Sequence, residues 1–349
     1  MPHNVLVTGA AGYIGGSVVA DILSRTDESL KEINVFAAAR SQDQVDKISK
    51  LERVHAFLVD LQDKPAVEYA IAKYESKLSA CVWSSVASMF TEEGGWPFGK
   101  VKDSDPLIDR QRELGLDNPV RKTNIVLADE GKAQGVETFN IPIQLTCSID
   151  GRGTGECRKL SVNIPALIRT SIRLKTVHKF DRDSVRTVHH SHTRDFSLTN
   201  VKTPGNVHIS DLTDLYILIL NKILKEEPIA VGTDRYFFSI AHRISWWKIM
   251  DKITEGLYAR GLVDEPIPKI WPNYDVAADA LGFPRKFIRP MCMPNGDLEP
   301  ANGTALGWRP KQDSEQKCLD QIEQEIKDVE ELDTVRMGLF DTLIAEQKQ

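Results

Sequence analysis

Three glycines at three-residue intervals, directly after a short apolar run, constrain this chain most strongly. Residues 5–7 predict a buried strand, Gly9, Gly12 and Gly15 follow it, and the apolar spacing over 17–23 predicts a helix. Glycines in this context let the turn close tightly and let the backbone approach a pyrophosphate. The N–H groups that begin the helix favour phosphate charge. The segment therefore predicts a dinucleotide site; the alternative is a structural turn that binds nothing.

The stretch 8–15, Thr-Gly-Ala-Ala-Gly-Tyr-Ile-Gly, resembles the cofactor motif of the short-chain dehydrogenases/reductases. Two later segments resemble landmarks of the extended members of that family. Residues 206–215 are similar to their V-H-V-x-D-L-A step, and residues 306–310 to their L-G-W-x-P segment. The resemblance implies an α/β fold, with a Rossmann-type doubly wound parallel sheet and a smaller, mostly helical C-terminal substrate region.

We expect two parts in this fold. The dinucleotide-binding domain comprises residues 1–165 and 206–240. The substrate-binding region, with a C-terminal helix, comprises residues 166–205 and 241–349. Apolar residues in the tail lie on one near-heptad stripe, which suits either packing on the body or a dimer contact.

Composition restricts the class of protein. The chain of 349 residues carries a formal net charge of −6, which argues against a general nucleic-acid binder. Five widely spread cysteines without metal-ligand spacing indicate a reducing compartment. No apolar run approaches the roughly 20 residues of a membrane span, and the chain enters a strand without a signal peptide. We expect a cytoplasmic protein with a small-molecule substrate, no nucleic-acid or membrane partner, and a monomeric or homodimeric state.

The end of the second predicted strand bears on the choice of cofactor. An NAD-specific site has an acid near this point, whereas this chain has Arg40 and Ser41. A guanidinium pairs well with a 2′-phosphate, which favours NADP (NADPH); the alternative is a solvated arginine. The resemblance also implies an adenine contact for Asp60 and Leu61. The expected cofactor contacts are Thr8, Gly9, Ala11, Gly12, Tyr13, Ile14, Gly15, Arg40, Ser41, Asp60, Leu61, Ser84, Asn124, Thr146 and Cys147.

The family's catalytic Ser, Tyr and Lys are missing or displaced. The resemblance aligns the Ser position with Val86, next to Ser85, and the Tyr-x-x-x-Lys positions with Val120 and Asn124. Ser85 remains a catalytic candidate if the alignment shifts by one residue, or it simply ends a strand. Asn124 is a candidate for bonding a ribose hydroxyl, but it lacks the positive charge that lowers a tyrosine pKa.

Residues 148–155 resemble the family's Y-G-x-G turn, with Asp150 in the aromatic place. The resemblance puts Thr146, Cys147 and Ser148 beside the nicotinamide, and Asp150 is a candidate proton donor. An apparent insertion follows, in which His192 belongs to a histidine cluster. Its spacing fits no standard metal site, so we expect no metal and a polar loop in which a histidine is available as acid or base.

Residues 91–118 predict a long loop over the site, where aromatic side chains either cover a substrate or anchor the loop. The expected substrate contacts are Val86, Trp96, Phe98, Val120, Ser148 and His192. Three functions fit these residues. The first is an NADPH-dependent reductase of an imine, iminium or carbonyl group in a hydrophobic natural-product-type metabolite. The second is a redox-neutral cyclase, isomerase or lyase that keeps NADP in its pocket, and the third is a non-catalytic NADP sensor.

Overall fold

The computed structural model describes residues 3–73, 78–143, 149–181, 183, 186–187, 201–202, 205–229, 234–292 and 296–332. The predictions for Thr146, Cys147, Ser148 and His192 lie outside these residues.

The N-terminal strands form a parallel ladder in the order β1-β2-β3. They are β1 (Asn4–Thr8), β2 (Asn34–Ala39) and β3 (Val54–Leu58). Helices α1 (Tyr13–Ser24) and α3 (Gln42–Ile48) lie in the crossovers. Strand, glycine turn and helix therefore follow one another as the sequence predicts.

A second parallel ladder joins β4 (Ala80–Val86) to β6 (Glu137–Ile143), with α6 (Pro119–Gln134) between them in the chain. In a third ladder, β11 (Gly205–His208) pairs in parallel with β7 (Ile149–Asp150) and antiparallel with β12 (His242–Arg243). Parallel strands alternating with helices confirm the Rossmann-type α/β class. Among the described residues, however, the ladders of β1 and β4 remain separate.

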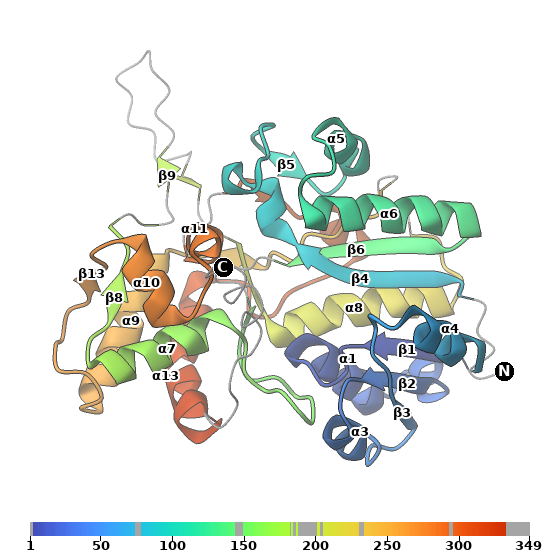
Figure 1. Cartoon of the computed structure of the whole chain (residues 1–349), viewed down its shortest axis with the longest axis horizontal. Coiled ribbons are helices and arrows are strands. Elements are labelled where there is room, and N and C mark those ends of the chain that lie inside the picture. Colours follow the sequence, from blue (N-terminus) through green and yellow to red (C-terminus); the bar gives the residue numbers. More distant parts are fainter. Residues whose placement is uncertain are drawn as a thin grey trace.

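Two groups of helices pack around these strands (Figure 1). α8 (Ile209–Leu224) lies along α1, beside the strands. α7 (Asn163–Leu174), α9 (Trp246–Ala259), α10 (Tyr274–Leu281) and α13 (Glu315–Leu332) lie together at the left of Figure 1. Large apolar side chains from these four helices form a separate core, which includes the tail residues Ile322, Ile326 and Val329. The described part of the tail stripe thus packs on the body.

The remaining elements are short. They are α2 (Glu28–Lys31), α4 (Lys64–Lys73), η1 (Ala87–Phe90), η2 (Glu92–Gly94), β5 (Val101–Lys102), α5 (Leu107–Glu113), β8 (His178–Lys179), β9 (Arg186–Thr187), β10 (Val201–Lys202), β13 (Lys269–Ile270), η4 (Arg285–Phe287), α11 (Ile288–Cys292), β14 (Leu298–Glu299) and α12 (Ala301–Leu306).

Residues 91–118 are more ordered than the loop that their composition predicts. Within them, β5 pairs in parallel with β14, and α5 follows. The carboxylate of Asp103 accepts hydrogen bonds from the backbone N–H groups of Ala301, Asn302 and Phe238 at 2.8, 2.9 and 2.9 Å. Residues 235–240 make an isolated parallel bridge between Tyr236 and Asn140.

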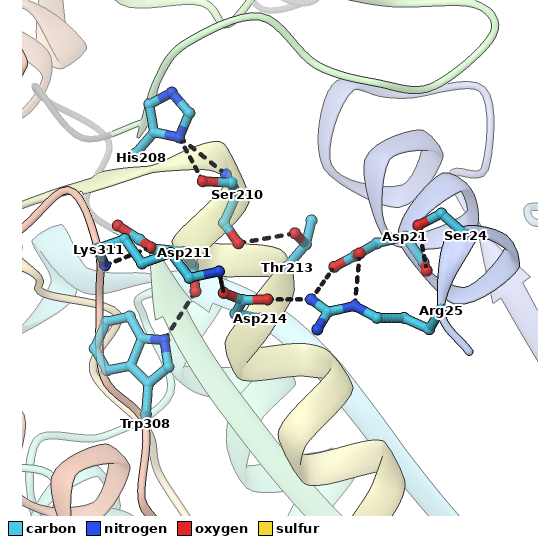
Figure 2. Close-up of polar contacts among 10 residues, drawn as sticks. All are labelled: Asp21, Ser24, Arg25, His208, Ser210, Asp211, Thr213, Asp214, Trp308 and Lys311. Carbon is cyan, nitrogen blue, oxygen red and sulfur yellow. Dashed lines mark hydrogen bonds and ion pairs between the residues drawn. The ribbon is translucent and has the colours of Figure 1, made fainter. Parts of the chain in front are cut away.

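The step from β11 into α8 is fixed by polar contacts (Figure 2). The carboxylate of Asp211 accepts from the backbone N–H groups of Lys311 and Gln312, each at 2.8 Å, and its carbonyl oxygen accepts from Trp308 Nε1 at 2.8 Å. The helix N-cap is His208, whose side chain accepts from the N–H of Ser210. Asp211 therefore joins two of the sequence landmarks and has a structural role.

Figure 2 also shows how α1 is tied to α8. The Arg25 guanidinium donates to both carboxylate oxygens of Asp21, at 2.9 and 3.1 Å, and also pairs with Asp214. These contacts hold the C-terminal end of the glycine-motif helix against α8.

Candidate cofactor site

The glycine turn between β1 and α1 tolerates no side chains at its key positions. Gly9 has φ +71°, in the left-handed region, and the Gly12 N–H donates to the Gly9 carbonyl at 2.7 Å. A Cβ at Gly15 would lie 2.4 Å from that carbonyl oxygen, and one at Gly12 would lie 3.0 Å from it. These glycines therefore let the turn fold directly onto the start of the helix.

The start of α1 offers backbone donors to a ligand. Its N-cap is Gly12, so no side chain caps the first turn, and no acidic residue lies in that turn. An uncapped helix of 12 residues presents N–H groups and the positive end of its dipole. Together with the glycine cradle, this is the geometry that a pyrophosphate requires.

A cavity of about 1540 Å³ opens beside this turn. Residues of both β1 and β4 line it, so the cavity separates the two ladders. Its volume exceeds the 300–1,000 Å³ of an ordinary small-molecule pocket. Its lining residues include Thr8, Gly9, Gly12, Tyr13, Ile14, Gly15, Ala38, Val59, Leu61, Ser84, Ser85, Val86, Ile143, Arg158, Ser161, Val162 and Asn163.

A second glycine run packs against the first. A Cβ at Gly155 would lie 2.6 Å from the carbonyl carbon of Gly16, and one at Gly153 would lie 2.8 Å from the Tyr13 ring. The Tyr13 hydroxyl donates to the Gly151 carbonyl at 2.7 Å. The resemblance to the Y-G-x-G turn predicted a turn here. It did not predict that alternate glycines would lock this turn onto α1.

The second glycine run brings a cation to the cavity. Arg158, three residues after Gly155, lines the same cavity as Gly9 and Gly12. Burial and the neighbouring Arg169 guanidinium lower the pKa of Arg158, as expected for a cation held in a partly dry, positive environment. The sequence analysis missed Arg158; the available signal was the repeat of glycine at 151, 153 and 155, which marks close backbone approach.

Residues 6–94 match the model of the 3-beta hydroxysteroid dehydrogenase/isomerase family. Solved structures are similar in fold over almost the whole chain. Vestitone reductase from alfalfa has a TM-score of 0.53 at 16% identity, covering 94% of this chain and 99% of that chain. The family model matches only the N-terminal part of the chain, and the match over the whole chain is a likeness of fold.

A second solved structure and one curated sequence are also similar to this chain. dTDP-glucose 4,6-dehydratase from Bacillus anthracis, in complex with NAD, has a TM-score of 0.57 at 12% identity and covers 95% of this chain and 97% of that chain. At these identities the likeness is one of fold. By sequence, dTDP-glucose 4,6-dehydratase 1 of Escherichia coli (strain K12) is 31% identical over 71 residues, so the match covers 20% of each protein.

The end of β4 lies on the cavity wall. Ser84, Ser85 and Val86 all line the cavity. The Ser85 hydroxyl donates to Asn140 Oδ1 at 2.6 Å, and the Ser84 hydroxyl contacts that of Tyr216. Burial raises the pKa of Tyr216 to about 12. Both serine hydroxyls therefore lie at the cavity wall and are bonded to neighbouring side chains.

The positions aligned with the family's Tyr and Lys lie elsewhere. Asn124 is buried, its Oδ1 accepts from Trp83 Nε1 at 3.3 Å, and its Nδ2 donates to Gln111 Oε1 at 3.2 Å. Val120 packs against an apolar cluster and, like Asn124, is not part of the cavity wall. The expectation that Asn124 bonds a ribose hydroxyl is corrected, because its amide is already engaged in the core.

Of the two aromatic residues of the 91–118 segment, Trp96 belongs to that apolar cluster and Phe98 packs against Trp96. Trp96 is buried and packs edge-to-face on Phe90 and Phe98, with ring centroids 4.9 and 5.0 Å apart. Phe98 is partly exposed under the Arg110 guanidinium, 5.6 Å from the ring centroid. Of the two alternatives, the contacts match anchoring, and neither ring lines the cavity.

The predicted adenosine-side residues lie at the ends of β2 and β3. Arg40 is exposed, and its backbone N–H donates to Gln44 Oε1 at 3.1 Å. The Ser41 hydroxyl caps α3. Asp60 is exposed, and Leu61 lines the cavity. Arg40 thus follows the end of β2 as an exposed residue and is not part of the cavity wall.

Asp150 lies away from the cavity wall. It is fully buried, and its Oδ1 accepts from Asn206 Nδ2 at 3.4 Å. A direct proton transfer from Asp150 to a substrate in the cavity does not fit this placement. Among the described residues, no group of three or more His, Cys, Asp or Glu side chains is arranged to hold a metal, and no helix is long and apolar enough to cross a membrane.

Proposed function

We propose that the chain is an NADPH-dependent reductase that acts on an imine, iminium or carbonyl group of a hydrophobic small metabolite. The observation that carries the proposal is the uncapped glycine turn opening into a cavity of about 1540 Å³. The cavity is large enough for a dinucleotide and a second molecule, and apolar strand residues form much of its wall. Bound NADPH would supply a hydride to an electrophilic carbon.

Several residues of this chain fit the cofactor. The N–H groups at the start of α1 and the Arg158 guanidinium would bind the pyrophosphate, and the exposed Arg40 after β2 would bind the 2′-phosphate. Ser84 and Ser85 would orient the ligand from the end of β4. We further propose that the protein is cytoplasmic and acts as a monomer or homodimer.

One observation favours a redox-neutral alternative. Val120, aligned with the family's Tyr, has no proton to donate, and Asn124, aligned with the family's Lys, is engaged in a buried network. A proton donor of the usual kind is therefore lacking. An iminium substrate needs little acid assistance, but a cyclase, isomerase or lyase needs none if positioning lowers the barrier, by about 7–11 kcal/mol at best. A non-catalytic NADP sensor remains the third candidate.

Cofactor binding is tested first by native mass spectrometry and by titration with NADPH and NADH. We expect NADPH to bind at least about tenfold more tightly than NADH, since a charge-assisted hydrogen bond contributes roughly 1.5–3 kcal/mol. Arg40→Ala should remove this preference, while Lys50→Ala, which removes an exposed cation beyond α3, should keep it. Equal affinities for the two nucleotides would refute the NADP assignment.

The reaction type is tested by following NADPH absorbance and product together, in a screen of imine and carbonyl substrates. One NADPH consumed per product supports the reductase. Product that forms without NADPH consumption supports the redox-neutral alternative. We also expect that Val120→Tyr with Asn124→Lys creates no strong carbonyl-reductase activity, because both positions lie outside the cavity wall; robust turnover would contradict this.

A further inference from the structure

A glutamate on the C-terminal helix is bonded to the turn that contacts the cofactor motif. Glu325 of α13 is 2% exposed, and its Oε1 accepts a hydrogen bond from the Gly151 N–H at 2.5 Å. The carbonyl oxygen of the same Gly151 accepts from the Tyr13 hydroxyl at 2.7 Å. Gly151 therefore links α13 on one side to the first residue of α1 on the other.

The turn has little freedom to move alone. A Cβ at Gly151 would lie 2.0 Å from Nε2 of His208, and Gly153 and Gly155 are in close contact with α1. The N–H of Thr154 donates to the Ser17 hydroxyl at 3.2 Å. A displacement of the turn at Gly151 is therefore transmitted to the start of α1, where the glycine cradle lies.

The carboxyl group of Glu325 shares its buried surroundings with two others. Asp150 on β7 and Asp328 on α13 are 0% and 1% exposed. Burial, and then the charges of these two carboxyls, raise the pKa of Glu325 to about 8, although the Gly151 N–H lowers it. Glu325 is therefore protonated at neutral pH and ionises just above it.

The other titratable groups near this carboxyl shift out of the same pH range. Burial raises the pKa of the Tyr13 phenol and of the Cys318 thiol well above their usual values, and burial lowers the pKa of His242 on β12. Arg152 in the turn pairs with Asp328 and Glu331 at 3.2 and 3.1 Å. Among these neighbours, Glu325 is the group that titrates between pH 7 and 9.

The charged residues of α9 that face α13 pair with carboxylates of α13 other than Glu325. Lys248 pairs with Glu315, and Arg260 pairs with Glu323 and Glu330. On α7, Arg169 and Arg173 lie near Glu330 at the rim of a smaller pocket. None of these contacts supplies a cation to Glu325.

We propose that Glu325 is a positioning residue for the cofactor: in its neutral form it holds the turn at 150–155 against α1, and its ionisation loosens that turn and weakens NADPH binding. An ionised Glu325 would repel Asp150 and Asp328 in a dry environment where charges interact strongly. Moving α13 or the turn relieves this repulsion. The inference rests on the proposed cofactor role of the glycine turn.

The test measures the dissociation constant of NADPH between pH 7 and 9.5 for the wild-type protein and for Glu325→Gln. Glutamine keeps the acceptor for Gly151 and cannot ionise. We expect the wild-type affinity to fall about fivefold or more across pH 8, as for modestly coupled sites, and the Glu325→Gln affinity to stay flat. Glu323→Gln, which alters an exposed carboxylate of the same helix, should follow the wild-type profile.

Two results would overturn the inference: a flat wild-type profile, or the same fall in Glu325→Gln. The first of these results is obtained with the wild-type protein alone, so it does not depend on whether a variant folds. Absence of NADPH binding at pH 7 would instead refute the proposed function. In that case the hold of Glu325 on the turn is measured directly, by amide hydrogen exchange of residues 149–155 corrected for the intrinsic exchange rate. Protection of these amides from exchange should fall between pH 7 and 9 in the wild type alone. Unchanged protection would refute the role of Glu325 in holding the turn.

Discussion

The hydroxyl of Ser17 on α1 accepts a hydrogen bond from the backbone N–H of Thr154, although the two residues are 137 positions apart. The same hydroxyl donates to the Tyr13 carbonyl at 2.7 Å, one turn earlier in its own helix. Ser17 thus connects the first turn of α1 to the second glycine run. The cofactor cradle is a composite of two distant segments, and each of them is a target for substitution.

Gly155→Ala should distort this contact. The added Cβ would lie 2.6 Å from the Gly16 carbonyl carbon, and neither backbone can give way cheaply. Overpacking of this kind costs about 1–3 kcal/mol, so we expect a melting temperature several degrees lower and weaker NADPH binding. Thr154→Ala changes an exposed neighbour as a control. Equal melting temperatures for Gly155→Ala and wild type would show that the glycine contact is dispensable.

Arg158→Ala should weaken NADPH binding without unfolding the protein. Loss of a charge-assisted hydrogen bond to a phosphate costs roughly 1.5–3 kcal/mol, which is about tenfold or more in affinity. Binding to NADH should weaken by a similar factor, because the pyrophosphate is common to both nucleotides. Lys159→Ala removes an adjacent cation that does not line the cavity. If both variants bind NADPH like the wild type, Arg158 has no part in the site.

Asp103→Asn should destabilise the fold through the segment at 91–118. Both carboxylate oxygens of Asp103 accept hydrogen bonds from backbone N–H groups. The side-chain NH2 of an asparagine would face at least one of these N–H groups, and neither could accept a hydrogen bond from the other. A buried unsatisfied donor costs about 1–3 kcal/mol, so the urea midpoint should fall. Asp109→Asn changes an exposed carboxylate of α5 and should leave the midpoint within error. A midpoint unaltered by Asp103→Asn would contradict the anchoring role.

Stability should depend on pH through Glu325. Its pKa is about 8 in the folded protein and about 4.5 when exposed, so between these values the folded state holds a proton that the unfolded state has released. The free energy of unfolding should therefore fall as pH rises from about 4.5 to 8, by a few kcal/mol, and then level off. Glu325→Gln should remove this component. Parallel pH profiles for the two proteins would argue against a buried, protonated glutamate.

The sequence predicts those features that local backbone chemistry requires. The spacing of Gly9, Gly12 and Gly15 after an apolar run predicts β1, the turn and α1, because each glycine meets a steric demand within seven residues. The start of α9 is a similarly local feature, since the Ser245 hydroxyl accepts from the Lys248 N–H. Requirements of this kind involve residues that are close together in the sequence.

The features that the sequence did not predict depend on distant partners. The contacts of Arg158 and Glu325 become visible only when the second glycine run lies on α1. Asn124 was assigned to a ribose by alignment, but Trp83 and Gln111 engage its amide in the core. Contacts across more than a hundred residues are set by the whole packing, which local pattern does not encode.

The link from Tyr13 through Gly151 to Glu325 has a consequence for synthesis of the chain. Tyr13 and Gly151 are 138 positions apart, and Gly151 and Glu325 are 174 apart. A ribosome delivers the glycine motif first, but the residues that brace it emerge only near the end of translation. Nascent chains that stop before α13 should therefore carry an unbraced nucleotide cradle, so that cofactor capture is a late event in the life of each new molecule.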